Sequence, residues 1–279
     1  MAVVEENLTP DSPLVSGVKV VYKKVVPLQI REEVWSLRHR EGEFPYTTSV
    51  SAGGVSAEFN ITSRRARISL KGFGWERGFL TDFLEVIRVD DVVWDIGANR
   101  GLYTVFAAKK IEKGNVVGFE PDPDVFQELA SNVALNNLSG NVHLRKYALG
   151  NEIGSLTLYT DNSPRQKSAS LKPVLNYGAQ VSVPVLTADY LVETGEIAAP
   201  TIVKLDVEGA EGVVLEGMRG LLASDARPRH LFVEIHNSDF LREFGTDARS
   251  ICSSVIEVGY EVVSARERFS EYLCHFAAI

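Results

Sequence analysis

The 279-residue sequence is short of the residues on which a disulfide-stapled, zinc-binding or membrane-spanning protein depends. It contains two cysteines, Cys252 and Cys274, both in apolar segments near the C-terminus. A disulfide framework or a thiolate metal site needs more cysteines than this, so we expect two buried free thiols. No apolar run approaches the ~18 residues of a membrane span. The N-terminus also lacks the basic and then apolar pattern of a signal peptide. The sequence is therefore typical of a soluble, cytoplasmic protein.

Basic residues are also too few for an electrostatic nucleic-acid binder. The chain has 29 Lys and Arg against 37 Asp and Glu, a net charge of −8 with a pI near 5.3. A duplex-binding protein needs a basic stripe that releases counterions, and no Lys/Arg block here is long enough to form one. The hydrophobic share of 45% and the charged share of 24% are ordinary for a globular protein, which excludes disordered and coiled-coil classes.

The first 75 residues are irregular in pattern. A valine-rich run from Val18 to Val26 predicts a strand, and Glu32 to Arg40 predicts a short helix. Apolar residues alternate over 55–61 and again over 66–70, which indicates a β-hairpin that turns at Ser63 to Arg65. Residues 71–78 follow as a predicted loop. We interpret 1–75 as an N-terminal, β-containing extension that covers the acceptor site or forms a homodimer contact.

From residue 76 onward, helical and strand patterns alternate. Helices are predicted around 79–88 and at 102–110, 124–136 and 209–222, and strands at 91–96, 115–120, 141–149, 153–160, 201–206 and 230–235. Strands that alternate with helices in this way indicate an α/β fold with a doubly wound, mostly parallel sheet. We therefore assign residues 76–279 to one domain.

The most informative segment is the glycine loop VVWDIGANRGLYT at residues 92–104. A buried strand runs into Asp95, two glycines follow at Gly97 and Gly101, and a helix begins at once. Glycine lets the backbone turn tightly and approach a ligand without a Cβ. In an open α/β sheet this turn lies at the carboxyl edge, where ligands bind. Glu120 ends the next strand, where its carboxylate can accept both hydroxyls of an adenosyl ribose.

Two kinds of nucleotide ligand compete for this loop. A dinucleotide fingerprint reads G-x-G-x-x-G, because a pyrophosphate sits against the helix N-terminus. Here Asn99 stands where the second glycine belongs, and Asp95 places a negative charge beside the loop. This pattern favours S-adenosylmethionine (SAM), which carries an amino group and a sulfonium. An NAD(P)-dependent oxidoreductase and a loop that only packs the helix on the strand remain as alternatives.

Five motifs in order resemble the FkbM family of SAM-dependent methyltransferases. They are DIGANRG at 95–101, FEPDPDVFQEL at 119–129, YALG at 147–150, KLDVEGAE at 204–211 and VEIH at 233–236. The resemblance covers residues 75 to 240 and implies a class I methyltransferase, Rossmann-like fold. It also implies methyl transfer from SAM to a hydroxyl oxygen of a small-molecule, sugar or natural-product acceptor. A SAM-binding module without catalysis is the non-enzyme alternative.

The resemblance assigns residues to each part of SAM. The loop from Asp95 would surround the methionine part, Glu120 would hold the ribose, and the remaining positions would border the adenine or the methyl group. The assigned residues are Asp95, Gly97, Asn99, Gly101, Glu120, Pro121, Asp122, Tyr147, Ala148 and Asp206.

Two further strand ends supply the candidate catalytic residues. Alternation places Lys204 and Asp206 on one face of their strand, and Glu234 and His236 on one face of the next. We predict His236 as the base that takes the hydroxyl proton, with Asp206 and Glu234 beside it. The alternatives are that Asp206 caps the helix that follows, or that Asp206, Glu234 and His236 hold Mg²⁺, Ca²⁺ or Mn²⁺.

The loop at 161–173 is polar and basic, and it connects two predicted strands. We interpret it either as a solvated loop or as a lid in which Arg165, Lys167, Ser168 and Ser170 meet the acceptor. Phe73 and Trp75 would stack on the acceptor or pack against the helix that follows.

Overall fold

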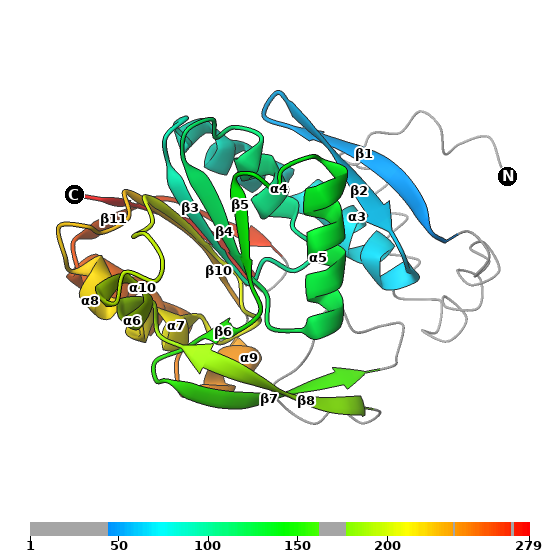
Figure 1. Cartoon of the computed structure of the whole chain (residues 1–279). Coiled ribbons are helices and arrows are strands. Elements are labelled where there is room, and N and C mark those ends of the chain that lie inside the picture. Colours follow the sequence, from blue (N-terminus) through cyan, green and yellow to red (C-terminus); the bar gives the residue numbers. More distant parts are fainter. Residues whose placement is uncertain (1–43, 162–176, 237, 269–270) are drawn as a thin grey trace, which may run out of the picture. The chain divides into compact units, whose positions relative to one another are not determined.

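A central sheet of seven strands organises the computed structural model (Figure 1). The structure describes residues 44–161, 177–236, 238–268 and 271–279, and residues 45–279 form a single unit. The predictions for 18–26, for 32–40 and for nearly all of the 161–173 loop lie outside the described residues. None of the described helices is long and apolar enough to cross a membrane.

The strand order identifies a doubly wound sheet. From one edge to the other it runs β11 (Tyr260–Arg268), β12 (Glu271–Ala278), β10 (His230–Ile235), β9 (Ile202–Leu205), β3 (Val92–Ile96), β4 (Asn115–Phe119) and β5 (Val142–Arg145). β10, β9, β3, β4 and β5 pair in parallel, whereas β12 is antiparallel to both of its neighbours. The chain winds outward in one direction from β3 and in the other from β9. The boundary between β3 and β9 is therefore the switch point at which ligands bind in such sheets.

Strand alternation divides the core into one cluster on each face of the sheet. In β3, Val93 belongs to one cluster and Trp94 to the other, and both side chains are fully buried. β9 is buried at all four positions, which is why it reads as a continuous apolar run in which Lys204 stands out. The predicted mostly parallel α/β sheet is confirmed.

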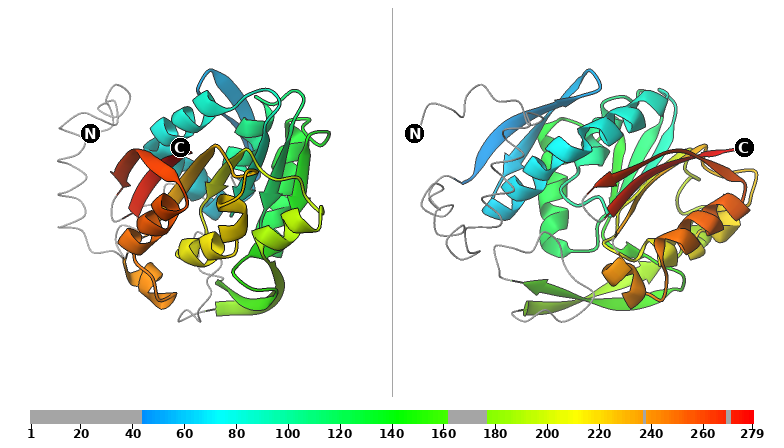
Figure 2. Two further views of the ribbon diagram at one scale, coloured as in Figure 1. Left: turned by 90° about the vertical axis from the view of Figure 1, so that its left-hand side faces the viewer. Right: turned by 180° about the vertical axis from the view of Figure 1, so that it is seen from behind.

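Helices cover both faces (Figures 1 and 2). The first core cluster contains residues of α3 (Arg64–Val86), α4 (Leu102–Ala108) and α5 (Pro123–Leu135). The second contains residues of α6 (Ala188–Glu193), α7 (Glu211–Glu216), α8 (Arg219–Leu222), α9 (Ser238–Glu243) and α10 (Ala248–Glu257). Asp122 caps α5, because its carboxylate accepts from the Asp124 and Val125 amides.

The predicted N-terminal hairpin is correct in type and wrong in position. β1 (Tyr46–Ala52) and β2 (Val55–Ile61) pair antiparallel around Gly53 and Gly54, whose φ angles are +53° and +76°. Residues 66–70 and the predicted loop at 71–78 both lie in α3, which begins where the Ser63 hydroxyl accepts from the Ala66 amide. Three alternating apolar residues were too few to distinguish a strand from a helix. α3 also runs through the predicted boundary between residues 75 and 76.

Two other elements differ from the predictions. The strand at 141–149 is divided into β5 and β6 (Ala148–Leu149), and β6 joins β7 (Gly154–Asp161) and β8 (Tyr177–Leu186) in a small second sheet. The helix at 209–222 is divided into α7 and α8. β8, β11, α6, α9 and α10 have no counterpart among the predicted elements.

The β1–β2 hairpin is held to α5 by side-chain amides. Asn132 Oδ1 accepts from the Asn60 amide at 2.9 Å. Asn136 exchanges two bonds with the Glu58 backbone, at 3.0 Å and 2.7 Å. Each amide side chain thus satisfies backbone groups of β2 that no further strand pairs with. The hairpin is thereby positioned beside the carboxyl edge of the sheet.

Candidate active site

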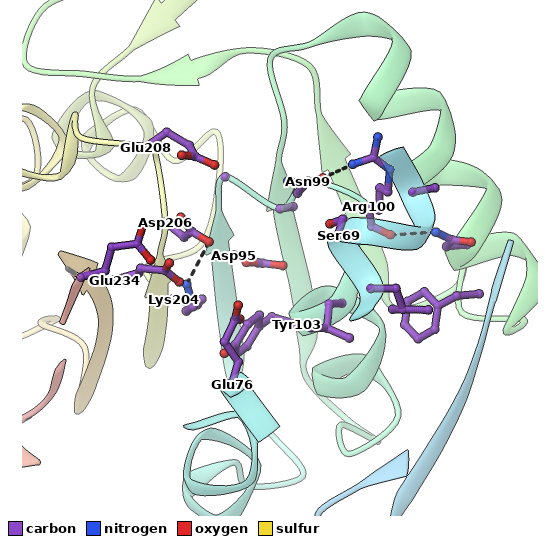
Figure 3. A pocket seen from close by; sticks show the side chains of 18 of the residues that line it. Ser69, Glu76, Asp95, Asn99, Arg100, Tyr103, Lys204, Asp206, Glu208 and Glu234 are labelled. Atoms are coloured by element: carbon purple, nitrogen blue, oxygen red, sulfur yellow. Dashed lines mark hydrogen bonds and ion pairs between the residues drawn. The ribbon is translucent and has the colours of Figure 1, made fainter. Parts of the chain in front are cut away.

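A pocket opens at the carboxyl ends of β3, β9 and β10 (Figure 3). The strand ends contribute Asp95, Lys204, Asp206, Glu234 and His236 to its lining. The opposite wall comes from β2 and α3, and includes Phe59, Asn60, Ile61, Ser69 and Glu76. The switch point of the sheet is thus lined by titratable side chains from three strands and by a wall from the N-terminal elements.

The glycine loop connects three strand ends. The amides of Gly97 and Ala98 both donate to the Phe119 carbonyl at the end of β4, at 3.0 Å and 2.9 Å. Gly97 has φ +80°, and a Cβ at this position would lie 1.8 Å from the Asp206 carbonyl oxygen at the end of β9. Only glycine fits this approach, so Gly97 allows β3, β4 and β9 to meet at one point.

Asp95 lies within the pocket and does not cap a helix. Its side chain is 2% exposed and accepts from Thr104 Oγ1 at 2.5 Å. Burial raises the pKa of Asp95 to about 6, although the Thr104 hydrogen bond and the Lys204 charge oppose that rise. The residue at the start of α4 is Gly101, which has no side chain to cap the helix.

Glu120 lies under the glycine loop. Its Oε2 accepts from the Asn99 amide at 2.8 Å and its Oε1 from the Asp122 amide at 2.9 Å. Burial raises the pKa of Glu120 to about 7 against these two bonds. A carboxylate has about four lone-pair sites, so both oxygens keep capacity for a further donor.

The structure divides the predicted SAM residues into two groups. Asp95, Gly97, Asn99 and Asp206 line the pocket. The other six stand apart from its lining, within the described part of the chain, and are Gly101, Glu120, Pro121, Asp122, Tyr147 and Ala148. Tyr147 instead contacts Phe119, with ring centroids 5.8 Å apart. Glu120 is connected to the lining through the Asn99 amide.

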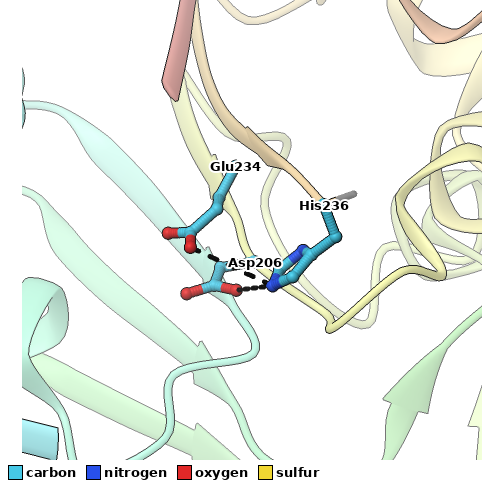
Figure 4. Close-up of side chains that lie close together, drawn as sticks. All are labelled: Asp206, Glu234 and His236. Atoms are coloured by element: carbon cyan, nitrogen blue, oxygen red, sulfur yellow. Dashed lines mark ion pairs between the residues drawn. The ribbon is translucent and has the colours of Figure 1, made fainter. Parts of the chain in front are cut away.

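His236 is the most highly connected side chain of the site. Its Nδ1 lies 2.8 Å from Oε1 of Glu211, which is fully buried. Its Nε2 lies 3.4 Å from Glu208, 3.9 Å from Asp206 Oδ1 and 4.0 Å from Glu234 Oε1 (Figure 4). Burial lowers the pKa of His236, but the surrounding carboxylates outweigh it and raise the pKa to about 12. With these neighbours the imidazole is protonated at neutral pH, so it can act as a base only after that proton has left.

The alternative view that Asp206 caps the following helix is wrong. α7 begins after Ala210, and no side chain accepts a bond at that position. Asp206 instead lies between Lys204 Nζ, at 3.7 Å from its Oδ2, and the His236 imidazole. The Gly209 amide donates to Glu211, whose other role is the contact with His236. Asp206 and Glu208 thus line the pocket, whereas Glu211 lies in the first turn of α7 and connects the Gly209 amide to His236.

Lys204 lies at the centre of the site, yet its sequence position indicated no role. Its side chain is 1% exposed, and Nζ lies 4.7 Å from the Tyr103 ring centroid. Burial lowers the pKa of Lys204, but Asp206, Glu234 and other nearby carboxylates outweigh it and raise the pKa. Lys204 therefore carries a charge that offsets those carboxylates. The one feature of the sequence that could have indicated a role for Lys204 is that it stands in an otherwise fully apolar strand.

The sequence patterns did not predict that Arg268 and Glu76 line the pocket. Arg268, near the end of β11, forms ion pairs with Glu76 of α3 and Glu234 of β10, and with Glu271 at 2.8 Å. Glu76 lies in a segment whose pattern predicted a loop. Residues 76 and 268 are 192 positions apart, so no local pattern could have indicated their contact.

The sheet order, the glycine loop and the acidic strand ends together define a class I methyltransferase. Residues 95–262 match the Methyltransferase FkbM domain, and the chain belongs to this family of SAM-dependent methyltransferases. The resemblance inferred from the five motifs is thereby confirmed, as are the fold, the enzyme class and the cofactor.

Two curated relatives each match about two thirds of this chain. The chain is 32% identical over 183 residues to the hexuronic acid methyltransferase AglP of Haloferax volcanii. This alignment covers 66% of this chain and 72% of the relative. It is 29% identical over 209 residues to the 31-O-demethyl-FK506 methyltransferase FkbM of Streptomyces tacrolimicus. That alignment covers 64% of this chain and 78% of the relative.

Proposed function

We propose that this protein transfers the methyl group of SAM to a hydroxyl oxygen of a sugar or natural-product acceptor. The observation that carries the proposal is the convergence of Asp206, Glu234 and His236 on one pocket beside the glycine loop. The names of the relatives support this class of acceptor, since one acts on a hexuronic acid and another on an FK506 precursor.

SAM is proposed to lie across the glycine loop. In this arrangement the loop residues Asp95, Gly97, Asn99 and Gly101 surround the methionine part, and Glu120 accepts from the ribose hydroxyls. The residues that border the adenine are Pro121, Asp122, Tyr147 and Ala148. Asp95 supports the proposal because a buried carboxylate suits a ligand that carries an ammonium and a sulfonium and would repel a pyrophosphate. This contrast also disfavours the NAD(P)-dependent alternative.

The acceptor hydroxyl is proposed to bind at Asp206, Glu234 and His236. The S–CH₃ bond breaks as the O–CH₃ bond forms in line with it, S-adenosylhomocysteine leaves, and the hydroxyl proton passes to His236 Nε2 once that nitrogen has lost its own proton, while Asp206 and Glu234 hold the hydroxyl in place. The methyl group is already activated by the sulfonium, so alignment is the main contribution of the protein. Holding the reacting atoms in line can lower the barrier by roughly 7–11 kcal/mol.

The hairpin and α3 are proposed to cover the acceptor. Phe59, Asn60 and Ile61 of β2, together with Ser69 and Leu70 of α3, form one wall of the pocket. This wall combines apolar surface with an amide and a hydroxyl, which suits a sugar or polyhydroxylated ring. The position of these residues supports a role in acceptor binding over the alternative of a homodimer contact.

The test separates catalysis from cofactor binding. His236→Ala is expected to reduce kcat by at least a hundredfold while the Kd for S-adenosylhomocysteine stays within about threefold of wild type. Turnover would be measured with labelled SAM and a panel of hydroxylated acceptors, and Kd by calorimetry. The matched control is His143→Ala, because His143 is exposed on β5 and apart from the pocket.

Two results would count against the proposal. Equal turnover by His236→Ala would remove this cluster from catalysis. Tight binding of S-adenosylhomocysteine by wild type, without turnover on any acceptor of the panel, would favour the silent SAM-binding module.

A further inference from the structure

We propose that Asp206, Glu234 and His236 form a divalent-cation site, of the Mg²⁺ or Mn²⁺ class, in which the acceptor hydroxyl is held. The proposal rests on the proposed function for the meaning of the site, but the binding of the cation can be measured without any acceptor. It makes His236 a ligand of the cation, in place of the free base predicted from the sequence, and the ion displaces the proton that Nε2 otherwise carries.

The geometry of the three side chains fits one ion. His236 Nε2 lies 3.9 Å from Asp206 Oδ1 and 4.0 Å from Glu234 Oε1, and all three ligand atoms lie within 4.8 Å of one another (Figure 4). A triangle with these edges has a point about 2.5 Å or less from every corner, so each ligand atom must close in by roughly 0.4–0.5 Å at most to reach the roughly 2.0–2.1 Å that Mg²⁺ prefers. The three atoms come from the ends of two adjacent parallel strands and need no loop to bring them together.

A buried and unsatisfied oxygen is the second observation. The Glu234 side chain is 3% exposed, and among the described residues no donor lies within hydrogen-bond distance of its Oε2. Its other oxygen is paired with Arg268. A buried carboxylate oxygen without a partner costs free energy, and a cation bound at the pocket would supply the missing interaction.

The balance of charge in the pocket leads to the same conclusion. Its cations are Lys204, Arg268, Arg100 and, while its imidazole is protonated, His236. Its carboxylates outnumber them, and are Glu76, Asp95, Asp206, Glu208, Glu234 and Glu271. Lys204 lies 3.7 Å from Asp206 Oδ2, whereas Oδ1 is the oxygen that faces His236. Lys204 therefore leaves one oxygen of Asp206 directed toward the cluster.

Glu211 contacts the second ring nitrogen of His236, as a carboxylate commonly does for a histidine that binds a metal ion. Ligating histidines almost always donate their other ring N–H to a carboxylate or carbonyl, which orients the ring and strengthens the ligand. Here Nδ1 of His236 lies 2.8 Å from Oε1 of the fully buried Glu211, so that Nε2 faces Glu208 at 3.4 Å as well as Asp206 and Glu234. This second contact is independent of the acidic cluster and fixes the nitrogen that would bind the ion.

The ligand set indicates the class of the ion. Two carboxylates and one imidazole suit Mn²⁺ and Mg²⁺, whereas the thiolate sites that prefer zinc or copper(I) have no counterpart among these ligands. Three protein ligands leave positions for water or for acceptor oxygens. A hydroxyl that binds the ion there loses its proton more readily, because the positive charge stabilises the oxyanion.

The test uses Mn²⁺ alone with the chelator-treated full-length protein. Wild type is expected to bind one Mn²⁺ per chain by calorimetry, and the spin-echo spectrum of the bound ion is expected to show coupling to an imidazole nitrogen. His236→Gln should abolish that nitrogen coupling, and Asp206→Asn or Glu234→Gln should weaken binding at least tenfold. Glu211→Gln should weaken it by roughly 10- to 100-fold through loss of the second contact.

The control variant is Glu152→Gln, because Glu152 is exposed and distant in sequence from every ligand. It is expected to bind Mn²⁺ as wild type does. Circular dichroism and thermal melts verify that each variant is folded. The proposal is overturned if wild type binds no Mn²⁺ at millimolar concentration. It is equally overturned if folded Asp206→Asn and Glu234→Gln bind Mn²⁺ as tightly as wild type, or if the nitrogen coupling is absent.

Failure of this proposal can be distinguished from failure of the proposed function. Methyl transfer that is unchanged in the presence of a chelator would refute the cation site and leave the methyltransferase proposal intact. Specific Mn²⁺ binding that depends on Asp206, Glu234 and His236, without turnover on hydroxylated acceptors, would support the site and count against the proposed acceptor class.

Discussion

Glu120 offers a sharp test of how SAM is held. If its carboxylate accepts from the ribose hydroxyls, then replacing it should weaken the binding of S-adenosylhomocysteine. A hydrogen bond to a charged group contributes roughly 1.5–3 kcal/mol, so loss of one such bond corresponds to roughly a 10- to 150-fold weaker Kd. Glu120→Gln retains the size of the side chain and removes its charge, and Glu120→Ala removes both acceptors.

The pH dependence of binding follows from the same carboxylate. Burial raises the pKa of Glu120 to about 7, so about a tenth of the free protein carries the ionised form at pH 6 and about nine tenths at pH 8. The ribose hydroxyls bind the ionised form, so affinity is present above the pKa and is lost as the pH falls through it. We therefore expect the wild-type Kd for S-adenosylhomocysteine to become about tenfold tighter between pH 6 and pH 8.

Isothermal titration calorimetry at pH 6, 7 and 8 measures both effects. At pH 6, titration in two buffers with different ionisation enthalpies should reveal release of about one proton on binding. Glu120→Gln should bind more weakly at pH 8 and lose most of the proton release and of the pH dependence, keeping only the smaller part that Asp95, with a pKa of about 6, contributes. Glu152→Gln, an exposed glutamate, serves as the control and should behave as wild type. A wild-type Kd independent of pH, or an unchanged affinity in Glu120→Gln, would refute the role of Glu120.

Two further predictions concern the stability of the site and its frame. Gly97→Ala should lower the free energy of unfolding by about 2–6 kcal/mol in urea, because a Cβ would meet the Asp206 carbonyl at 1.8 Å in a strained backbone. Gly54→Ala has a similar φ with open space around it, so it should cost less than half as much; equal losses would contradict the steric argument. Asp91→Asn should cost about 1.5–3 kcal/mol at pH 7, because Asp91 accepts two bonds from Arg229, at 2.8 Å and 2.9 Å. Burial acts to raise the pKa of Asp91, but its hydrogen bonds lower the pKa below the usual value. The stability that the Asp91 carboxylate contributes is therefore lost as the pH falls through the folded pKa. Thermal melts should show the difference in stability between wild type and Asp91→Asn narrowing below about pH 4.

The site was predictable where it depends on the geometry of parallel strands. Strand ends at the carboxyl edge of a doubly wound sheet must meet, and a period of two decides which side chains share a face. The sequence pattern therefore places Asp95, Asp206, Glu234 and His236 together, and the pocket contains all four.

Contacts between distant segments were not predictable in this way. The Glu211–His236 contact joins the first turn of α7 to the end of β10, and both Glu76 and Arg268 come from segments whose patterns indicated no role. Local periodicity reports which face of an element is buried, but it does not report the partner across that face. These residues set the charge of the pocket, and only their positions in the folded chain showed it.

By itself, the sequence determined the class of fold, the glycine loop and the family. Each follows from local requirements, namely continuous apolar strands, a turn that only glycine allows, and acids at strand ends. Only the tertiary structure decided that residues 66–78 form a helix. Ala66 and Phe79 are buried there, and packing against neighbouring elements outweighs a short alternating pattern. It also decided that Nε2 of His236 faces three carboxylates, because the charge around a side chain depends on every segment that folds against it.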